Sequence, residues 1–180
     1  MSEASARDPV IRLADLCGAV QRQVSSLGAF TPVSAAEVPE PFRDLLDHHS
    51  HMTVVMERHH RGAVGLRVLA EVDDAVGRYA REILLVSADG RVVQFGIVRI
   101  DLTAVDDHTA ARIRAGAEPL GRILLAAGVL CVVGDVALFE IVPGTHLQPL
   151  IGVGRTFGRV ANIALDGRPA VELLEVVAGV

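Results

Sequence analysis

The fold is decided by the stretch Tyr79-Ala80-Arg81-Glu82-Ile83-Leu84-Leu85-Val86, a β-branched and aliphatic run. A turn signal, Ser87-Ala88-Asp89-Gly90, follows it, and a second apolar run begins at Val92, so the stretch predicts a β-hairpin. Side chains alternate between the two faces of a strand, which places Arg81 in phase with Ile83 and Leu85, and Glu82 in phase with Leu84 and Val86. Both faces are apolar further along the strand. A charge near its start is therefore expected to point toward the core.

A buried Arg81 requires an anion beside it, because the guanidinium does not lose its proton. One source is a carboxylate of the protein itself. Glu175 is a candidate, since it lies in phase with Val171, Leu173 and Val177 in the last apolar run. The other source is the carboxylate of a bound ligand. A structural Arg81–Glu175 ion pair and a ligand site therefore stand as alternatives.

Composition limits the classes of protein. The chain has 180 residues, 51% hydrophobic and 22% charged, which predicts one globular domain over residues 1–180. A net charge of -5 and 3% aromatic residues argue against a nucleic-acid groove. No signal peptide and no apolar run of ~18 residues are present, which argues against a membrane span. Cys17 and Cys131 show no metal or redox spacing, so we expect a cytoplasmic protein; the oligomeric state stays open, a monomer included.

The order of apolar patterns predicts an α+β domain with a mainly antiparallel β-sheet and flanking helices. Residues 1–8 are expected to be disordered, and residues 9–44 to form an N-terminal helical region. The expected helices cover Val10–Leu27, Ala110–Gly116 after a cap at Asp106 or Asp107, and a segment that starts at Pro119. Another expected helix has Pro41 in its first turn, runs through Phe42, Leu45 and Leu46, and stops around His48 to Ser50. Pro32 and Pro39 bracket a connecting segment. The expected strands cover Met52–Met56, Ala63–Leu69, the hairpin, Leu130–Val133 or Val136–Val142, Val160–Leu165 and Val171–Val177.

Other possible sites are weaker. The histidines at positions 48, 49, 51, 59 and 60 match no closed metal site, so solvated or hydrogen-bonded side chains are the default interpretation and no metal is expected. Gly152-Val153-Gly154 lacks the third glycine of a dinucleotide site. Pro119-Leu120-Gly121-Arg122 is more informative, because a helix beginning at Pro119 leaves the N–H groups of Leu120 and Gly121 free to bind an anion.

Several short motifs occur in a fixed order. They are Ser50-His51-Met52-Thr53, Ala80-Arg81-Glu82-Ile83-Leu84-Leu85, Ala88-Asp89-Gly90, Pro119-Leu120-Gly121-Arg122, Phe157-Gly158-Arg159 and Gly167-Arg168-Pro169 with a glutamate after it. In this order they resemble chorismate lyase, the chorismate–pyruvate lyase that forms 4-hydroxybenzoate. The resemblance covers residues 45–177, which we interpret as the chorismate-lyase-like core.

The resemblance implies an antiparallel sheet whose flaps enclose the ligand. It implies that Arg81 and the N–H groups of Met52 and Leu120 bind the product carboxylate, and that Glu175 binds the product hydroxyl. Arg81 and Glu175 would be the catalytic residues for elimination of pyruvate from chorismate, with no metal or organic cofactor. Aromatisation drives this reaction, so the protein mainly holds the substrate in a reactive geometry.

Two positions depart from the family pattern. Ile97 stands where the family has an arginine after the glycine of the second hairpin strand, and Arg99, two residues on, is a candidate substitute. The glutamate follows Pro169 with one residue more than in the family, so Glu172 and Glu175 are both candidates, and Glu175 requires a bulge.

Alternative functions remain open. One is a lyase that acts on another enolpyruvyl ring acid or releases 3-hydroxybenzoate. Another is a non-catalytic module that binds aromatic acids, because the same fold serves as the effector domain of some transcription regulators. Those regulators carry a DNA-binding domain ahead of it, and the residues before Leu45 are too few and insufficiently basic for one.

Overall fold

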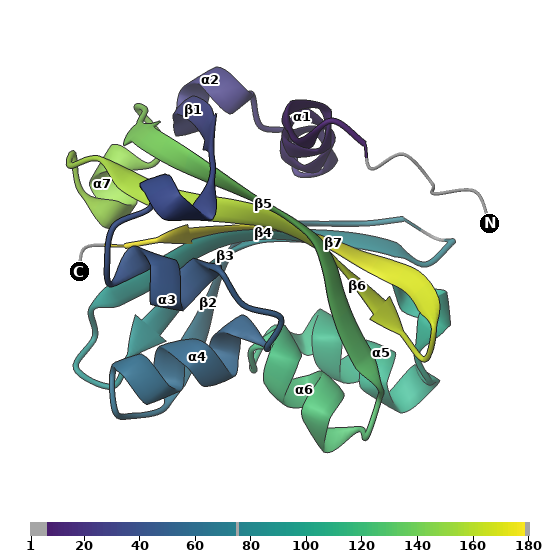
Figure 1. Cartoon of the computed structure of the whole chain (residues 1–180). Helices are drawn as coiled ribbons and strands as arrows, with labels where there is room; N and C mark the ends of the chain where they lie inside the picture. The colour runs from purple at the N-terminus through teal and green to yellow at the C-terminus, as the bar shows by residue number, and fades with distance from the viewer. Residues whose placement is uncertain (1–6, 75, 179–180) are drawn as a thin grey trace.

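A computed structural model describes residues 7–74 and 76–178 of the chain (Figure 1). Within this part, seven strands form one sheet in the order β1-β5-β6-β7-β4-β3-β2, and every neighbouring pair is antiparallel. The strands are β1 Gly28–Val33, β2 Val64–Asp73, β3 Arg78–Ser87, β4 Val92–Asp101, β5 Cys131–Pro143, β6 Thr156–Leu165 and β7 Arg168–Val177. The predicted α+β class with a mainly antiparallel sheet is confirmed.

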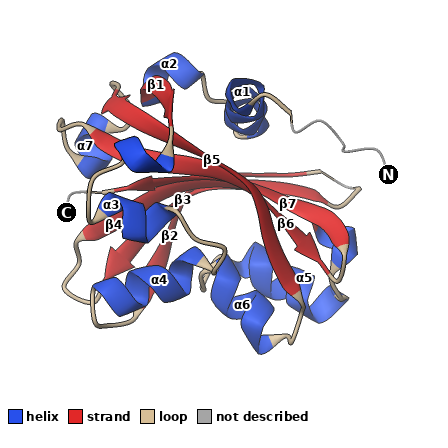
Figure 2. Cartoon of the chain, viewed as in Figure 1, coloured by secondary structure: helices blue, strands red, loops and turns tan. Residues whose placement is uncertain are grey.

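Helices cover both faces of the sheet (Figures 1 and 2). On one face lie α1 Pro9–Ala19 and α2 Val24–Leu27; on the other lie α3 Phe42–Leu46, α4 Met52–His59, α5 Asp107–Ala115 and α6 Leu120–Ala126, and α7 Gln148–Ile151 joins β5 to β6. Among the described residues, no helix has both the length and the apolar character needed to cross a bilayer. The helix starts follow local chemistry: Asp8 accepts from Val10 N at 2.8 Å, and Asp106 accepts from Thr109 N at 2.7 Å.

The hairpin of β3 and β4 lies inside the sheet, with β2 on one side and β7 on the other. Both faces of β3 are buried, as the sequence predicts. Leu84 packs with Phe95, Ile97 and residues of α1 in one core cluster, whereas Ile83 and Leu85 pack beneath α3 and α4 in another. Arg81 and Glu82 are both buried, and they point to opposite faces because adjacent strand residues alternate.

Glu82 has its own protein partners on the α1 face. Its carboxylate is fully buried, accepts from Arg22 Nε at 2.8 Å, and lies 2.8 Å from His146 Nε2. Burial, and to a smaller extent the negative charge of Glu82, raises the pKa of the Cys17 thiol to about 12. This carboxylate is therefore part of the core on that face and connects β3 to the segment between α1 and α2.

Arg22→Ala is expected to lower the free energy of unfolding by about 3 kcal/mol, since it leaves the buried Glu82 carboxylate with His146 as its remaining charged partner among residues 7–74 and 76–178. Urea denaturation measures the change. Arg91→Ala is the matched control, because Arg91 forms an exposed ion pair with Asp89, and its loss is expected to cost less than ~0.5 kcal/mol. Equal effects of the two substitutions would contradict this role for Arg22.

Two of the predicted elements are wrong. The helix expected over Val10–Leu27 breaks into α1 and α2, because Gln21 adopts a left-handed φ of 58° and Arg22 turns inward to Glu82. The strand expected over Met52–Met56 is the helix α4. Its buried side chains include Met52 and Met56, one helical turn apart, which outweighs the β propensity of the two valines between them.

Smaller differences concern the ends of elements. The expected helical region 9–44 includes strand β1, which ends inside the segment bracketed by Pro32 and Pro39. Pro32 is tolerated there because β1 is an edge strand. The sequence left Leu130–Val133 and Val136–Val142 as alternative strands. Both belong largely to one long strand, β5, which has a register shift between Gly134 and Ala137. Of the residues expected to be disordered, 1–6 lie outside the described residues, whereas Asp8 caps α1.

Candidate functional site

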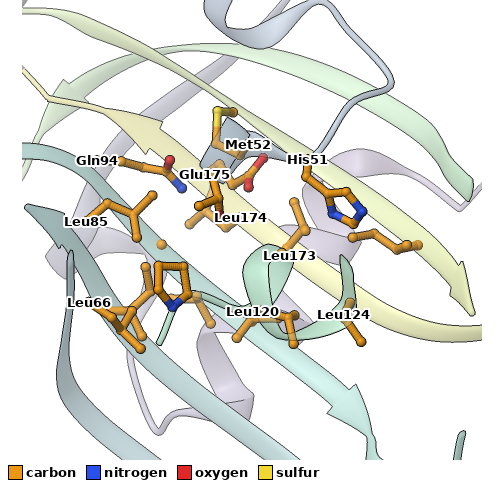
Figure 3. A pocket seen from close by; sticks show the side chains of 18 of the residues that line it. His51, Met52, Leu66, Leu85, Gln94, Leu120, Leu124, Leu173, Leu174 and Glu175 are labelled. Atoms are coloured by element: carbon orange, nitrogen blue, oxygen red, sulfur yellow. The ribbon is translucent and has the colours of Figure 1, made fainter. Parts of the chain in front are cut away.

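A cavity lies between the sheet and the helices α4 and α6. It is bordered by residues of the strands β2 to β7 and by the first residues of both helices. The space in which the centre of a water molecule fits has a volume of about 70 Å³. This is several times the ~10–15 Å³ that one water needs. The walls are largely apolar, and include Leu66, Ile83, Leu85, Leu120, Leu124 and Leu173 (Figure 3). This size and lining suit a small organic ligand with an apolar body.

Arg81 lines the cavity and is 1% exposed. Its Nη1 donates to the carbonyl oxygen of Ile113 at 3.0 Å, and its buried Nε has no hydrogen-bond partner among the described residues. Within the same part of the chain, no carboxylate lies within ion-pair distance of Arg81. Burial lowers the pKa of Arg81, yet an arginine remains charged at neutral pH. A buried cation therefore borders the cavity with spare donor capacity.

Tyr79 and Glu71 oppose the effect of burial and raise the pKa of Arg81, but neither forms an ion pair with it in the described part of the chain. Glu71 is its cross-strand neighbour on β2, but the Glu71 carboxylate accepts from the Tyr79 hydroxyl at 2.9 Å. Burial and this hydrogen bond to Glu71 raise the pKa of Tyr79 to about 12, so the phenol is neutral at physiological pH. Arg81 is therefore left without an ion-pair partner in the described part of the chain, on the wall of the cavity.

Glu175 also lines the cavity, and its partner is Arg159 rather than Arg81. Arg159 Nε donates to Glu175 Oε2 at 2.7 Å, and the two residues are directly opposite on β6 and β7. Arg159 Nη1 also donates to the carbonyl oxygens of Leu46 at 2.9 Å and His48 at 2.7 Å. The Arg81–Glu175 ion pair considered from the sequence is therefore wrong. Arg159 neutralises Glu175 and attaches the α3–α4 connection to the sheet.

A bulge in β7 explains why Glu175, and not Glu172, borders the cavity. The register of β6 and β7 shifts between Ile163, opposite Val171, and Ala164, opposite Pro169, which leaves Ala170 as the extra residue. Glu172 consequently lies on the other face of the sheet, where it forms an ion pair with Arg99.

The structure does not bring Arg99 to the cavity. Arg99 lies on the same face of β4 as Ile97 and Phe95, because residues two apart on a strand share a face. Ile97 and Phe95 pack in the core cluster that contains α1 residues. Its side chain borders a surface hollow together with Arg7 and Asp15, on the face opposite to Arg81. Ile97 likewise places its side chain on that face. Neither position supplies a second cation beside Arg81.

The first turns of α4 and α6 meet at the cavity. Met52 and Leu120, the first residues of the two helices, both border it. A Cβ at position 121 would lie 3.0 Å from Thr53 Oγ1 and 3.2 Å from His51 Cβ, so Gly121 permits this close approach. Burial lowers the pKa of His51, which also borders the cavity, with Glu175 opposing the shift. His51 is therefore neutral at physiological pH.

Arg159 and Gln94 are polar residues of the cavity that were not identified from the sequence as site residues. Arg159 was noted only as part of a motif, and its in-phase position on an apolar strand was the available signal. Gln94 is 3% exposed, lines the cavity, and has an Oε1 with no hydrogen-bond partner among the described residues. A lone glutamine in an apolar strand was the only sequence signal, and it did not indicate a ligand.

Comparison with solved structures identifies the fold. PhnF from Mycobacterium smegmatis matches with a TM-score of 0.53 and 13% identity, over 73% of this chain and 64% of that chain. Gene product SA0254 from Staphylococcus aureus matches at 0.45 and 11%, over 63% of this chain and 82% of that one. The possible transcriptional regulator YydK from Bacillus subtilis matches at 0.44 and 9%, over 63% and 58%.

The likeness to PhnF, together with the sheet described above, shows the chorismate-lyase-like fold. The chain spans less than two thirds of the length of PhnF. No protein-family model matches the sequence, and neither does any curated protein. At these identities the likeness establishes the fold and not an activity, because one fold hosts many functions.

Proposed function

We propose that the chain is a binding module for a small organic monocarboxylate, which occupies the cavity with its carboxylate against Arg81. The observation that carries the proposal is the buried guanidinium of Arg81, which borders an apolar cavity without an ion pair among the described residues. A cation in such surroundings is strongly stabilised by an anion. The carboxylate would accept charge-assisted hydrogen bonds from the guanidinium donors that the Ile113 carbonyl oxygen does not occupy.

The rest of the cavity fits the same ligand. The leucine and isoleucine side chains would cover a ring or a short apolar chain. The N–H groups of Met52 and Leu120, each the first residue of a helix at the cavity, are free of intrahelical acceptors. They are the groups that the resemblance to chorismate lyase assigns to carboxylate binding.

Charge balance favours a monocarboxylate over chorismate, which carries two carboxylates. Arg81 has no ion pair with any described residue, Arg159 is neutralised by Glu175, and burial keeps His51 neutral. Arg99, the candidate for a second cation, lies on the other face of the sheet. One carboxylate of a bound dianion would remain without a cationic partner, at a considerable desolvation cost.

Titration calorimetry with benzoate and 4-hydroxybenzoate tests the proposal. We expect a Kd on the order of 10 µM, or about -7 kcal/mol for a ligand of about ten non-hydrogen atoms. Benzamide, which has the shape of benzoate without its charge, is expected to bind ~100-fold more weakly. Equal affinity for benzoate and benzamide, or no binding of either acid at millimolar concentration, would contradict the proposal.

A lyase is the second candidate, because Met52, Arg81, Leu120 and Glu175 all border the same cavity. In that case Arg81 would orient a carboxylate of chorismate, and Glu175 would orient the ring hydroxyl or relay a proton. Incubation with chorismate distinguishes the candidates. A binding module forms no pyruvate above the spontaneous rate, whereas a lyase forms pyruvate together with 4-hydroxybenzoate or another ring acid, which chromatography identifies.

A further inference from the structure

The α3–α4 connection, residues 47–51, forms one side of the cavity. Ser50 and His51 of this connection border the cavity, and so does Met52, the first residue of α4. Figure 1 shows that the connection runs from α3 to the end of α4 that lies beside α6. A displacement of this connection would therefore open the cavity on this side.

His48 holds the connection in place through both of its ring nitrogens. Nε2 lies 2.9 Å from the carbonyl oxygen of Leu45, and Nδ1 lies 3.2 Å from the backbone nitrogen of Ser50. Nδ1 also lies 3.4 Å from Nη1 of Arg159. A carbonyl oxygen accepts only, whereas a backbone N–H and a guanidinium donate only. These partners therefore fit one form of the ring, the neutral imidazole with its hydrogen on Nε2.

The charges that act on the His48 ring come from the sheet. Burial lowers the pKa of His48 most, and the positive charge of Arg159 on β6 lowers it further, whereas Glu175 on β7 and two hydrogen bonds to the backbone oppose the shift. The helix α3 presents an uncharged carbonyl oxygen to the ring, and burial lowers the pKa of His51 in the same connection. A proton on Nδ1 would point an N–H group at two donors. One of them is the Arg159 cation, which is held there by its hydrogen bonds to the carbonyl oxygens of Leu46 and His48.

We propose that the α3–α4 connection is a gate of the cavity, which opens when His48 is protonated and then releases a bound carboxylic acid more rapidly. The inference rests on the proposed function for its ligand, whereas the gate itself can be measured in the empty protein. When the connection opens, His48 is exposed to water and takes up a proton near its ordinary pKa of about 6.5. In the closed form it takes up a proton only at a lower pH, because burial and Arg159 lower its pKa. The closed form therefore loses stability as the pH falls below ~6.5.

Amide exchange in the ligand-free protein tests the gate. The amides of Ser50, Val54 and Val55 are suitable reporters, because their acceptors, His48 Nδ1 and the His51 carbonyl oxygen, belong to the connection. After correction for the intrinsic pH dependence of exchange, we expect their protection to be about tenfold lower at pH 5.5 than at pH 7.5, since pH 5.5 lies about one unit below the ordinary histidine pKa. Equal protection at the two pH values would overturn the inference.

His48→Gln assigns the pH dependence to one residue. Glutamine can also donate to one partner and accept from the other, but it does not titrate, so the protection of the three amides should no longer differ between the two pH values. His49→Gln is the matched control, because His49 is an exposed histidine of the same connection, and it should keep the roughly tenfold difference. A pH dependence in His48→Gln as large as in the wild type would overturn the role of His48.

The dissociation rate of benzoate, measured from NMR line shapes, tests the effect of the gate on the site. We expect release to be about tenfold faster at pH 5.5 than at pH 7.5 in the wild type, and equally fast at both in His48→Gln. An ordinary carboxylic acid has a pKa of about 4 and stays ionised in this range, so the change comes from the protein. A release rate of the wild type that does not depend on pH would overturn the inference. If benzoate does not bind at all, the proposed function fails, whereas amide exchange in the empty protein still decides whether the gate exists.

Discussion

Arg81→Met is expected to abolish the binding of carboxylic acids and to raise the thermal stability of the protein. The substitution removes a buried cation that has no ion pair among the described residues, and an apolar side chain of similar length fills its place. We expect a gain of about 1–2 kcal/mol in the free energy of unfolding, after the loss of one hydrogen bond to Ile113 is included. Affinity for benzoate should fall by ~100-fold or more, since the ligand loses its charged partner.

Calorimetry measures both effects of Arg81→Met, as a shift of the unfolding temperature and as a change in Kd. Arg67→Met is the matched control, because Arg67 is an exposed arginine on the neighbouring strand β2, and it should change neither quantity. If Arg81→Met unfolds the protein or lowers its stability by several kcal/mol, Arg81 is a structural residue with an internal partner, and the binding proposal loses its main support.

Arg159→Met is expected to have the opposite effect on stability, although Arg159 is as buried as Arg81 at 1% exposure. Its removal leaves the Glu175 carboxylate unpaired and takes the donor from the carbonyl oxygens of Leu46 and His48. We expect the free energy of unfolding to fall by about 3–5 kcal/mol. Urea denaturation measures this loss, and amide exchange in residues 47–51 should accelerate, because the α3–α4 connection loses its attachment to the sheet.

The double variant Arg159→Met with Glu175→Leu shows how much of the stability loss of Arg159→Met comes from the unpaired Glu175 carboxylate. Removing both charges is expected to restore about half or more of the lost stability, since the unpaired carboxylate is gone while the two carbonyl oxygens stay without a donor. Arg155→Met is the control, because Arg155 forms an exposed pair with Glu140 and should change stability by less than ~0.5 kcal/mol. A double variant as unstable as Arg159→Met alone would show that the ion pair is not the main contribution.

Local sequence determined the hairpin of β3 and β4, the antiparallel sheet around it, and the burial of Arg81. These features depend on alternation within one strand and on turn chemistry, and both act between residues close in the chain. The same alternation placed Glu175 on a buried face. Helix capping by Asp106 and the helix that begins after Pro119 are equally local, so they too were predictable.

Contacts between distant segments decided the remaining features. The helix expected over Val10–Leu27 divides because Arg22 turns inward to Glu82. The segment Met52–Met56 is a helix because its methionines are buried beside α3 and the sheet.

The surroundings of the buried residues Arg81 and Arg159 were also decided by contacts between distant segments. Alternation predicts which face a side chain occupies, but not which residue stands opposite, and the single extra residue at Ala170 shifts the register so that Arg159 faces Glu175. Arg81 is consequently left without an ion pair among the described residues, beside the cavity. The sequence alone determined that Arg81 needs an anion; only the tertiary structure decided that Glu175 is not that anion, because strand register depends on the whole sheet.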